Sequence, residues 1–279
     1  MSTVHPIAPR TALFLPASNA RAIEKARTLD ADMVLLDLED AVREEAKDDA
    51  RAAAVSAVGQ GFGARPCAIR VNGLGHSAHN ADVAAIAESK ADFAILPKAE
   101  SAQSVALVAS ALQKPLLVMI ETPLGVLNAA DIAALPEVVG VIAGTNDLRA
   151  ELHIPDNAPR DAIGVALQTI VLAARAHGCW ALDGVFNALG DAEGLERECL
   201  AGRALGFDGK TLIHPNQIAV AARAFGPTDA EIEEARALIE AASGGAERFR
   251  DRMIEAMHVE RARALLARVD GQAVLPCSR

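Results

Sequence analysis

The chain has 279 residues, a formal net charge of -10 at pH 7 and a sequence pI of about 5.2, and 51% of its residues are hydrophobic. A chain of this length and composition can bury a large core, as one large α/β domain or two small ones, which excludes general disorder. The acidic balance argues against a general affinity for nucleic acid or for an anionic membrane.

Short apolar runs alternate with alanine-rich amphipathic stretches along most of the chain. Eight runs have the length and composition of buried strands, at 11–16, 33–38, 67–71, 93–96, 116–120, 138–143, 180–185 and 209–213. The segments between them predict helices at 20–29, 44–58, 81–90, 102–112, 162–177 and 192–205. Strands that are apolar on both faces are typical of a parallel sheet, and the connections are long enough for crossover helices.

This order of elements predicts a (β/α)8 TIM barrel over residues 1–226, with an open doubly wound sheet as the alternative. Thr228-Asp229-Ala230-Glu231 is a capping-box pattern that predicts a further helix. Gly244 and Gly245 then precede a second helical stretch, predicted at 247–269. We therefore expect residues 227–279 to form a C-terminal helical extension that is not an independent domain.

The four cysteines are scattered, with no Cys-x-x-Cys pair and no histidine at zinc-ligand spacing, which favours reduced thiols. The N-terminus lacks the basic region and apolar run of a secretory signal. No stretch reaches the roughly 20 apolar residues that cross a bilayer. These features predict a soluble, cytoplasmic protein.

Polar side chains follow seven of the eight predicted strands, where the active site of a TIM barrel lies. They are Asp37-Leu38-Glu39-Asp40, Arg70-Val71-Asn72, Lys98, Glu121, Asn146-Asp147, Asp183 and His214. Any one of them could be an ordinary cap or turn residue. Carboxylates crowded at one barrel mouth need a counter-charge, which a divalent cation can supply.

Glu121 and Asp147 are the predicted Mg2+ ligands, because each follows a strand alone and Mg2+ prefers carboxylate oxygens. Asp37, Glu39 and Asp40 form a cluster better suited to hold the metal waters, although they could also cap the helix predicted at 44–58.

Two basic residues follow strands of the same predicted barrel. Arg70 can bind a carboxylate or a developing enolate oxygen, or form a salt bridge to the acids of the second strand. Lys98 could form a Schiff base with a keto acid, but acids on both neighbouring strands favour a protonated ammonium in an outer shell of the metal site.

Six ordered segments resemble the citrate lyase β-subunit-like members of the HpcH/HpaI aldolase/citrate lyase family. They are Leu35-Leu36-Asp37-Leu38-Glu39-Asp40-Ala41-Val42, Arg70-Val71-Asn72, Leu96-Pro97-Lys98-Ala99-Glu100-Ser101, Ile120-Glu121-Thr122-Pro123, Gly144-Thr145-Asn146-Asp147-Leu148 and residues 206–217. The resemblance implies a TIM barrel of the pyruvate kinase-like group, assembled as a homotrimer or hexamer. It also implies Mg2+ on Glu121 and Asp147, a substrate carbonyl or carboxylate on Arg70, and metal waters supported by Glu39 and Asp40.

The resemblance includes one departure, in the C-terminal extension. Members acting on malyl or citramalyl thioesters commonly carry a Met-Ile-Asp-x-Pro-His-type motif whose aspartate is implicated in proton transfer. Here the segment reads Met253-Ile254-Glu255-Ala256-Met257-His258. Glu255 keeps the carboxylate on a longer arm, and Met257 replaces a proline that would stiffen the turn.

The resemblance implies an oxo-acid lyase that cleaves or forms a malyl, citramalyl or citryl thioester by a retro-Claisen or aldol mechanism. The partners expected are a small 2-oxo acid and an acyl group on coenzyme A or on an acyl carrier protein. Arg21, Lys25 and Arg27 are available cations for the coenzyme A phosphates. A metal-dependent 2-keto acid aldolase that does not use coenzyme A, and a citrate lyase β-type subunit with little activity alone, remain as alternatives.

Overall fold

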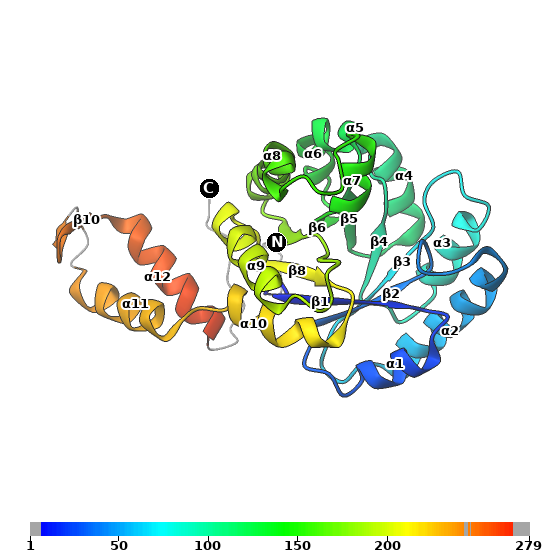
Figure 1. Ribbon diagram of the computed structural model, residues 1–279, viewed down its shortest axis with the longest axis horizontal. Coiled ribbons are helices and arrows are strands. Elements are labelled where there is room, and N and C mark those ends of the chain that lie inside the picture. Colours follow the sequence, from blue (N-terminus) through cyan, green and yellow to red (C-terminus); the bar gives the residue numbers. More distant parts are fainter. Residues whose placement is uncertain (1–6, 243–244, 246, 270–279) are drawn as a thin grey trace. The chain divides into compact units, whose positions relative to one another are not determined.

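A computed structural model describes residues 7–242, 245 and 247–269. The chain divides into two compact units, with Pro9–Phe225 in one and the described residues from Gly226 onward in the other. Figure 1 shows the first unit as strands surrounded by helices, and the second as the elements α11, β10 and α12.

Eight parallel strands form a closed barrel in chain order, β1-β2-β3-β4-β5-β6-β7-β8 (Figure 1). The strands are β1 (Thr11–Pro16), β2 (Met33–Asp37), β3 (Cys67–Arg70), β4 (Phe93–Leu96), β5 (Leu116–Ile120), β6 (Val138–Ala143), β7 (Trp180–Asp183) and β8 (Gly209–Leu212). Hydrogen bonding between β1 and β8 closes the sheet. The predicted TIM barrel is therefore confirmed, and the open doubly wound sheet is excluded.

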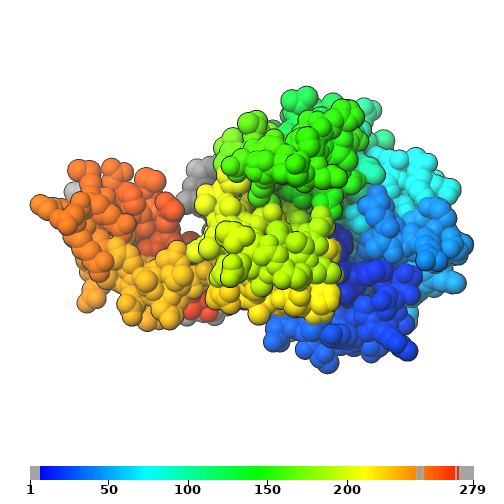
Figure 2. All heavy atoms as spheres, viewed as in Figure 1, coloured from blue at the N-terminus to red at the C-terminus, as the bar shows by residue number. Residues whose placement is uncertain are grey.

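Helices cover the outside of the barrel. They are α1 (Ala20–Ala26), α2 (Lys47–Gln60), α3 (His79–Ala87), α4 (Ala102–Leu112), α5 (Pro123–Leu127), α6 (Ala129–Ala133), α7 (Thr145–Glu151), α8 (Gly164–His177), α9 (Ala192–Leu205) and α10 (Ile218–Phe225), with 3-10 turns η1 (Glu44–Ala46), η2 (Arg160–Ile163) and η3 (Pro215–Gln217). Figure 2 shows the same view with all heavy atoms drawn, coloured by position in the sequence.

Strand side chains alternate between the barrel interior and the layer beneath the helices. Leu36, Ile69 and Ile120 belong to the same apolar cluster as helix residues such as Ile86 and Leu112. These positions therefore face outward. Residues of the other parity, such as Asp37, Arg70 and Glu121, face the interior and the mouth of the barrel.

The three short helices α5, α6 and α7 were not predicted. Helix α5 begins because the Thr122 side chain accepts a hydrogen bond from the Gly125 amide, with Pro123 at the first helical position. Helix α7 begins directly after β6 and carries Asp147 in its first turn. Both helices start at the carboxyl ends of strands and therefore help to shape the barrel mouth.

The second unit contains α11 (Asp229–Ala241), strands β9 (Glu247–Phe249) and β10 (Arg252–Ile254), and α12 (Ala256–Val269). The predicted capping box is present, with Thr228 and Glu231 bonded reciprocally. The helix predicted over 247–269 is confirmed for α12 and wrong before it, because β9 and β10 pair as an antiparallel hairpin. Phe249 and Ile254 are buried with Leu238 of α11, and this packing favours the hairpin over a continuous helix.

No helix in the described part of the chain combines the length and apolar character needed to cross a bilayer.

Candidate active site

Glu121 and Asp147 come from neighbouring strand ends and are linked through Lys98. Glu121 follows β5 and is only 3% exposed. Its Oε1 accepts a hydrogen bond from the Lys98 amide at 2.7 Å. Lys98 Nζ lies 3.6 Å from Asp147 Oδ2. The two predicted metal ligands thus meet the same lysine at the carboxyl ends of β4, β5 and β6.

Gly144 makes room for the Glu121 side chain. A Cβ at position 144 would lie 2.3 Å from Glu121 Cβ and 2.4 Å from its Oε2. Such distances do not occur between non-bonded atoms, so the absence of a side chain at Gly144 is what lets the carboxylate occupy this position. Sequence reasoning missed this residue, since its role depends on contact between two strand ends.

Arg70 is held rigidly beside this pair. Its Nε and Nη2 donate to the two carboxylate oxygens of Asp37 at 2.6 and 2.7 Å, a bidentate arrangement. Its Nη1 lies 2.8 Å from Glu39 Oε2 and 3.6 Å from Asp40 Oδ2. The guanidinium carbon lies 5.1 Å from the centre of the Phe14 ring. These contacts fix the plane of the Arg70 guanidinium at the carboxyl end of β3.

The loop after β2 has a specific local structure that places Glu39. The Asp37 carboxylate accepts hydrogen bonds from the amides of Glu39 and Ala41, at 2.9 and 3.1 Å. On the other side of the loop, the buried Lys47 ammonium donates to the carbonyls of Leu38, Glu39 and Val42, at 3.0, 3.1 and 3.3 Å. The burial of Lys47 could not be predicted from the helix expected at 44–58, because a lysine in an amphipathic helix normally lies on the surface.

Burial dominates the electrostatics of the two mouth glutamates. It raises the pKa of Glu121 to about 7, with Asp147 adding to the shift and the Lys98 amide and Arg70 opposing it. It raises the pKa of Glu39 to about 8, with Arg70 opposing the shift and Asp40 adding to it. For Lys98, partial burial acts to lower the pKa, but the nearby Glu39 and Asp147 outweigh it and raise the pKa above its ordinary value. A protonated ammonium is not a nucleophile, which disfavours the Schiff-base alternative.

Glu121 and Asp147 fit a Mg2+ ion better than a metal that needs an all-protein cage. The two cations whose charge acts on Glu121 are already paired, Arg70 with Asp37 and Lys98 with Asp147. No group of three or more His, Cys, Asp or Glu residues within the described ranges could hold a metal. Mg2+ commonly uses one or two carboxylates and completes its shell with water and substrate oxygens. The ligand roles of Glu121 and Asp147 stay a prediction.

Not all of the polar strand ends contribute to the mouth. Asp183 points outward instead, where its carboxylate bonds Lys210 Nζ at 2.9 Å and Arg160 Nη2 at 2.6 Å. Glu198 of α9 contacts the same two cations at 2.7 and 3.1 Å, which makes a buried cluster of four charges. Assigning Asp183 to the mouth was wrong, because it has the same parity as the outward-facing Ala181.

Two other strand ends also have structural partners. The Asn72 side chain donates to Asp82 of α3 at 2.6 Å, and Asp82 is itself completely buried. The His214 side chain accepts a hydrogen bond from the Asn216 amide and caps η3. These contacts give each of the two side chains a structural role, although Asn72 Oδ1 is buried without a hydrogen-bond partner.

Glu255 belongs to the second unit. It is exposed just before α12, and its amide donates to His258 Nδ1 at 3.0 Å. Its role in proton transfer stays a prediction.

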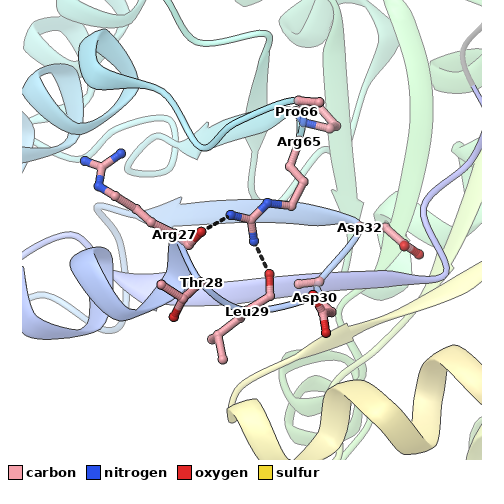
Figure 3. A pocket seen from close by; sticks show the side chains of 9 residues that line it. Arg27, Thr28, Leu29, Asp30, Asp32, Arg65 and Pro66 are labelled. Carbon is pink, nitrogen blue, oxygen red and sulfur yellow. Dashed lines mark hydrogen bonds between the residues drawn. The ribbon is translucent and has the colours of Figure 1, made fainter.

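A pocket of about 530 Å3 lies at the opposite ends of the strands, before β2 and β3. Figure 3 shows Arg65 in this pocket pointing at the backbone carbonyls of Arg27 and Leu29. Arg65 thereby caps the C-terminal end of α1. Arg27 is paired with Glu24 and Gln60. Whether Arg27, Arg21 or Lys25 contacts coenzyme A phosphates stays a prediction.

Comparison with known proteins identifies two family models along the chain. The model described as HpcH/HpaI aldolase/citrate lyase matches residues 10–215. A model described as a carbon-carbon bond lyase of the TIM-barrel fold matches residues 160–272.

Curated relatives and solved structures match nearly the whole chain. A (3S)-malyl-CoA thioesterase of Cereibacter sphaeroides is 44% identical over 98% of each chain. A citrate lyase subunit beta-like protein of Deinococcus radiodurans is 36% identical over 92% of this chain and 96% of that protein. The structure also resembles a crystal structure of CitE from Mycobacterium tuberculosis in complex with magnesium, acetoacetate and coenzyme A. The TM-score is 0.81 and the sequences are 34% identical, over 94% of this chain and 98% of that chain.

Proposed function

Because the chain belongs to the HpcH/HpaI aldolase/citrate lyase family, we propose that it is a Mg2+-dependent carbon-carbon lyase acting on a 3-hydroxyacyl-CoA thioester. Malyl-CoA is the substrate class we favour, since relatives at 42% to 44% identity bear that substrate in their names. The observation that carries the proposal is the mouth itself, where Glu121 and Asp147 converge on Lys98 beside a rigidly held Arg70.

Cleavage requires a Lewis acid, a base, stabilisation of the enolate and a final proton donor. Mg2+, when bound by Glu121 and Asp147, supplies Lewis-acid polarisation of the substrate oxygens. Loss of the hydroxyl proton to a base breaks the adjacent carbon-carbon bond and leaves an enolate on the thioester fragment. Arg70 is the group that we propose stabilises the enolate oxygen, through the Nη1 group that contacts Glu39 in the structure. Protonation of the enolate by Glu255 is the step that we propose completes the reaction.

A second candidate is hydrolysis of the same thioester, and the names of the relatives at 42% to 44% identity favour it. The two reactions give different products from (3S)-malyl-CoA. Carbon-carbon cleavage yields a 2-oxo acid and an acyl-CoA with no free thiol, whereas hydrolysis yields malate and free coenzyme A.

The test supplies (3S)-malyl-CoA with and without Mg2+, and follows 2-oxo acid and free thiol separately. We expect 2-oxo acid to form, and Glu121→Gln and Asp147→Asn each to remove it, while Glu88→Gln at an exposed site on the barrel surface leaves it unchanged. Free thiol without 2-oxo acid would identify a thioesterase. Activity that survives EDTA undiminished would refute the metal role, and turnover of 4-hydroxy-2-oxo acids alone would identify the aldolase that does not use coenzyme A.

A homotrimer or hexamer is proposed from the family resemblance alone, and light scattering on the purified protein measures it. An active homo-oligomer would also count against a subunit that is inactive without its partners.

A further inference from the structure

Lys98 has an unusual backbone conformation for its position. Its φ of +49° lies in the left-handed region, which a residue with a side chain adopts at a cost. Gln113 has a φ of +53°, but it caps the end of α4, where this conformation is common. Lys98 instead follows strand β4, where no helix end requires it. Strained backbone of this kind often occurs at functional sites.

The left-handed residue Lys98 lies between two bonded groups, because its own amide donates to Glu121 and the following Ala99 amide donates to the Met119 carbonyl at 3.1 Å. The Lys98 amide donates a hydrogen bond of 2.7 Å to Glu121 Oε1, and Glu121 is only 3% exposed. A hydrogen bond from an amide to a buried carboxylate is among the stronger ones in proteins. It occupies Oε1, whereas Oε2 lies against Gly144.

The Lys98 side chain makes a weaker contact with the other predicted ligand. Nζ lies 3.6 Å from Asp147 Oδ2, and the two side chains are 47% and 36% exposed. Exposed ion pairs contribute little and exchange readily. The ammonium therefore lies near Asp147 where it can give way to a divalent cation, whereas the backbone bond to Glu121 has no such freedom.

We infer that Lys98 is a positioning residue for the metal site, and that it acts mainly through its backbone. The left-handed conformation fixes Glu121 with one oxygen bonded and the other available to the cation, while the ammonium neutralises Asp147 until the cation arrives. This inference rests on the proposed Mg2+ site. The backbone conformation of Lys98 preorganises that site, so the lysine side chain itself should be dispensable for metal binding.

Three variants separate the two contributions. Lys98→Gly adopts the left-handed region freely and keeps the amide, but it lacks the ammonium. Lys98→Val also lacks the ammonium, and its β-branched side chain resists the left-handed region. Gln113→Val places the same strain at the end of α4, away from the mouth, and serves as the matched control.

Binding is measured by Mg2+ calorimetry and by electron paramagnetic resonance of Mn2+, with thermal unfolding recorded for each variant. We expect Lys98→Gly to bind within about threefold of the unsubstituted protein, and Lys98→Val to bind about 10- to 100-fold more weakly, as loss of a charge-assisted hydrogen bond predicts. Gln113→Val should lose stability without losing affinity. If Lys98→Val does not fold, Lys98→Ala should bind more weakly than Lys98→Gly.

The possible failures are distinct. Equal affinity in Lys98→Val and Gln113→Val would overturn the backbone role, as would an equally large loss in Lys98→Gly. No Mg2+ or Mn2+ binding by the unsubstituted protein would refute the proposed metal site, and with it the inference.

Discussion

Gly144→Ala is the substitution that tests most directly whether Glu121 needs its present position. The added methyl would lie 2.3 Å from Glu121 Cβ, whereas an ordinary contact between carbon atoms is about 3.5 Å, so the two must separate by about 1.2 Å. Rotating the Glu121 side chain cannot relieve this contact, because Cβ is attached directly to the backbone at the end of β5. The strand ends must therefore move apart, which should lower the free energy of unfolding by about 1–3 kcal/mol.

The same displacement should weaken metal binding. Mg2+ demands near-ideal octahedral geometry, and a shift of about 1 Å in an active site can cost about a hundredfold. We expect Mg2+ affinity, measured by calorimetry, to fall by about 10- to 100-fold in Gly144→Ala. Gly59→Ala is the control, since a Cβ at this position in α2 meets nothing within 4 Å. It should bind Mg2+ normally and gain about 0.5–1 kcal/mol of stability. Unchanged affinity in Gly144→Ala would refute the steric argument.

The remaining predictions concern charge. Because burial raises the pKa of Glu121 to about 7 and that of Glu39 to about 8, the folded metal-free protein binds protons more tightly than the unfolded chain. It should lose stability as the pH rises from about 4.5 through 8, and Mg2+ should raise the melting temperature more at about pH 8.5 than at about pH 5.5; an equal rise at both would contradict this. Lys47→Met should weaken Mg2+ binding, because it frees the loop that carries Glu39. Lys47→Arg should restore part of the Mg2+ affinity. The control Lys114→Met loses a single hydrogen bond to the Ser89 carbonyl and should not change the Mg2+ affinity. Lys210→Met should cost about 3–5 kcal/mol in denaturant unfolding, because it leaves Asp183 and Glu198 to share Arg160; a loss below about 1 kcal/mol would show that the cluster relaxes.

The barrel could be predicted because its strands carry a strong local signal. Parallel strands covered on both faces are apolar throughout, so runs such as Leu116–Ile120 stand out from the alanine-rich helices between them. The hairpin of β9 and β10 gave no comparable signal, since strands of three residues are too short to show alternation. The five-residue helices α5 and α6 were missed for the same reason.

The site could be predicted only in part. Strand ends predicted that Glu121, Asp147 and Arg70 lie close together, as they do, because a parallel barrel brings all such ends to one rim, while their roles stay predictions. They misplaced Asp183, since the sequence does not say which parity of a strand faces inward when both faces are apolar. They also missed Gly144 and Lys47, whose roles depend on contacts between segments that fold together. The αL conformation of Lys98 has no sequence signal either, because nothing about a lysine after a proline indicates it.

The charge cluster beneath α9 also constrains how this barrel can change over evolutionary time. Asp183, Glu198, Arg160 and Lys210 balance one another, and Asp183 and Lys210 have no access to solvent. A single substitution at any of them leaves a charge without a partner, so every variant with one of the four residues replaced should be less stable. The four positions should therefore covary among relatives, with the whole set kept or exchanged together for apolar residues of similar volume.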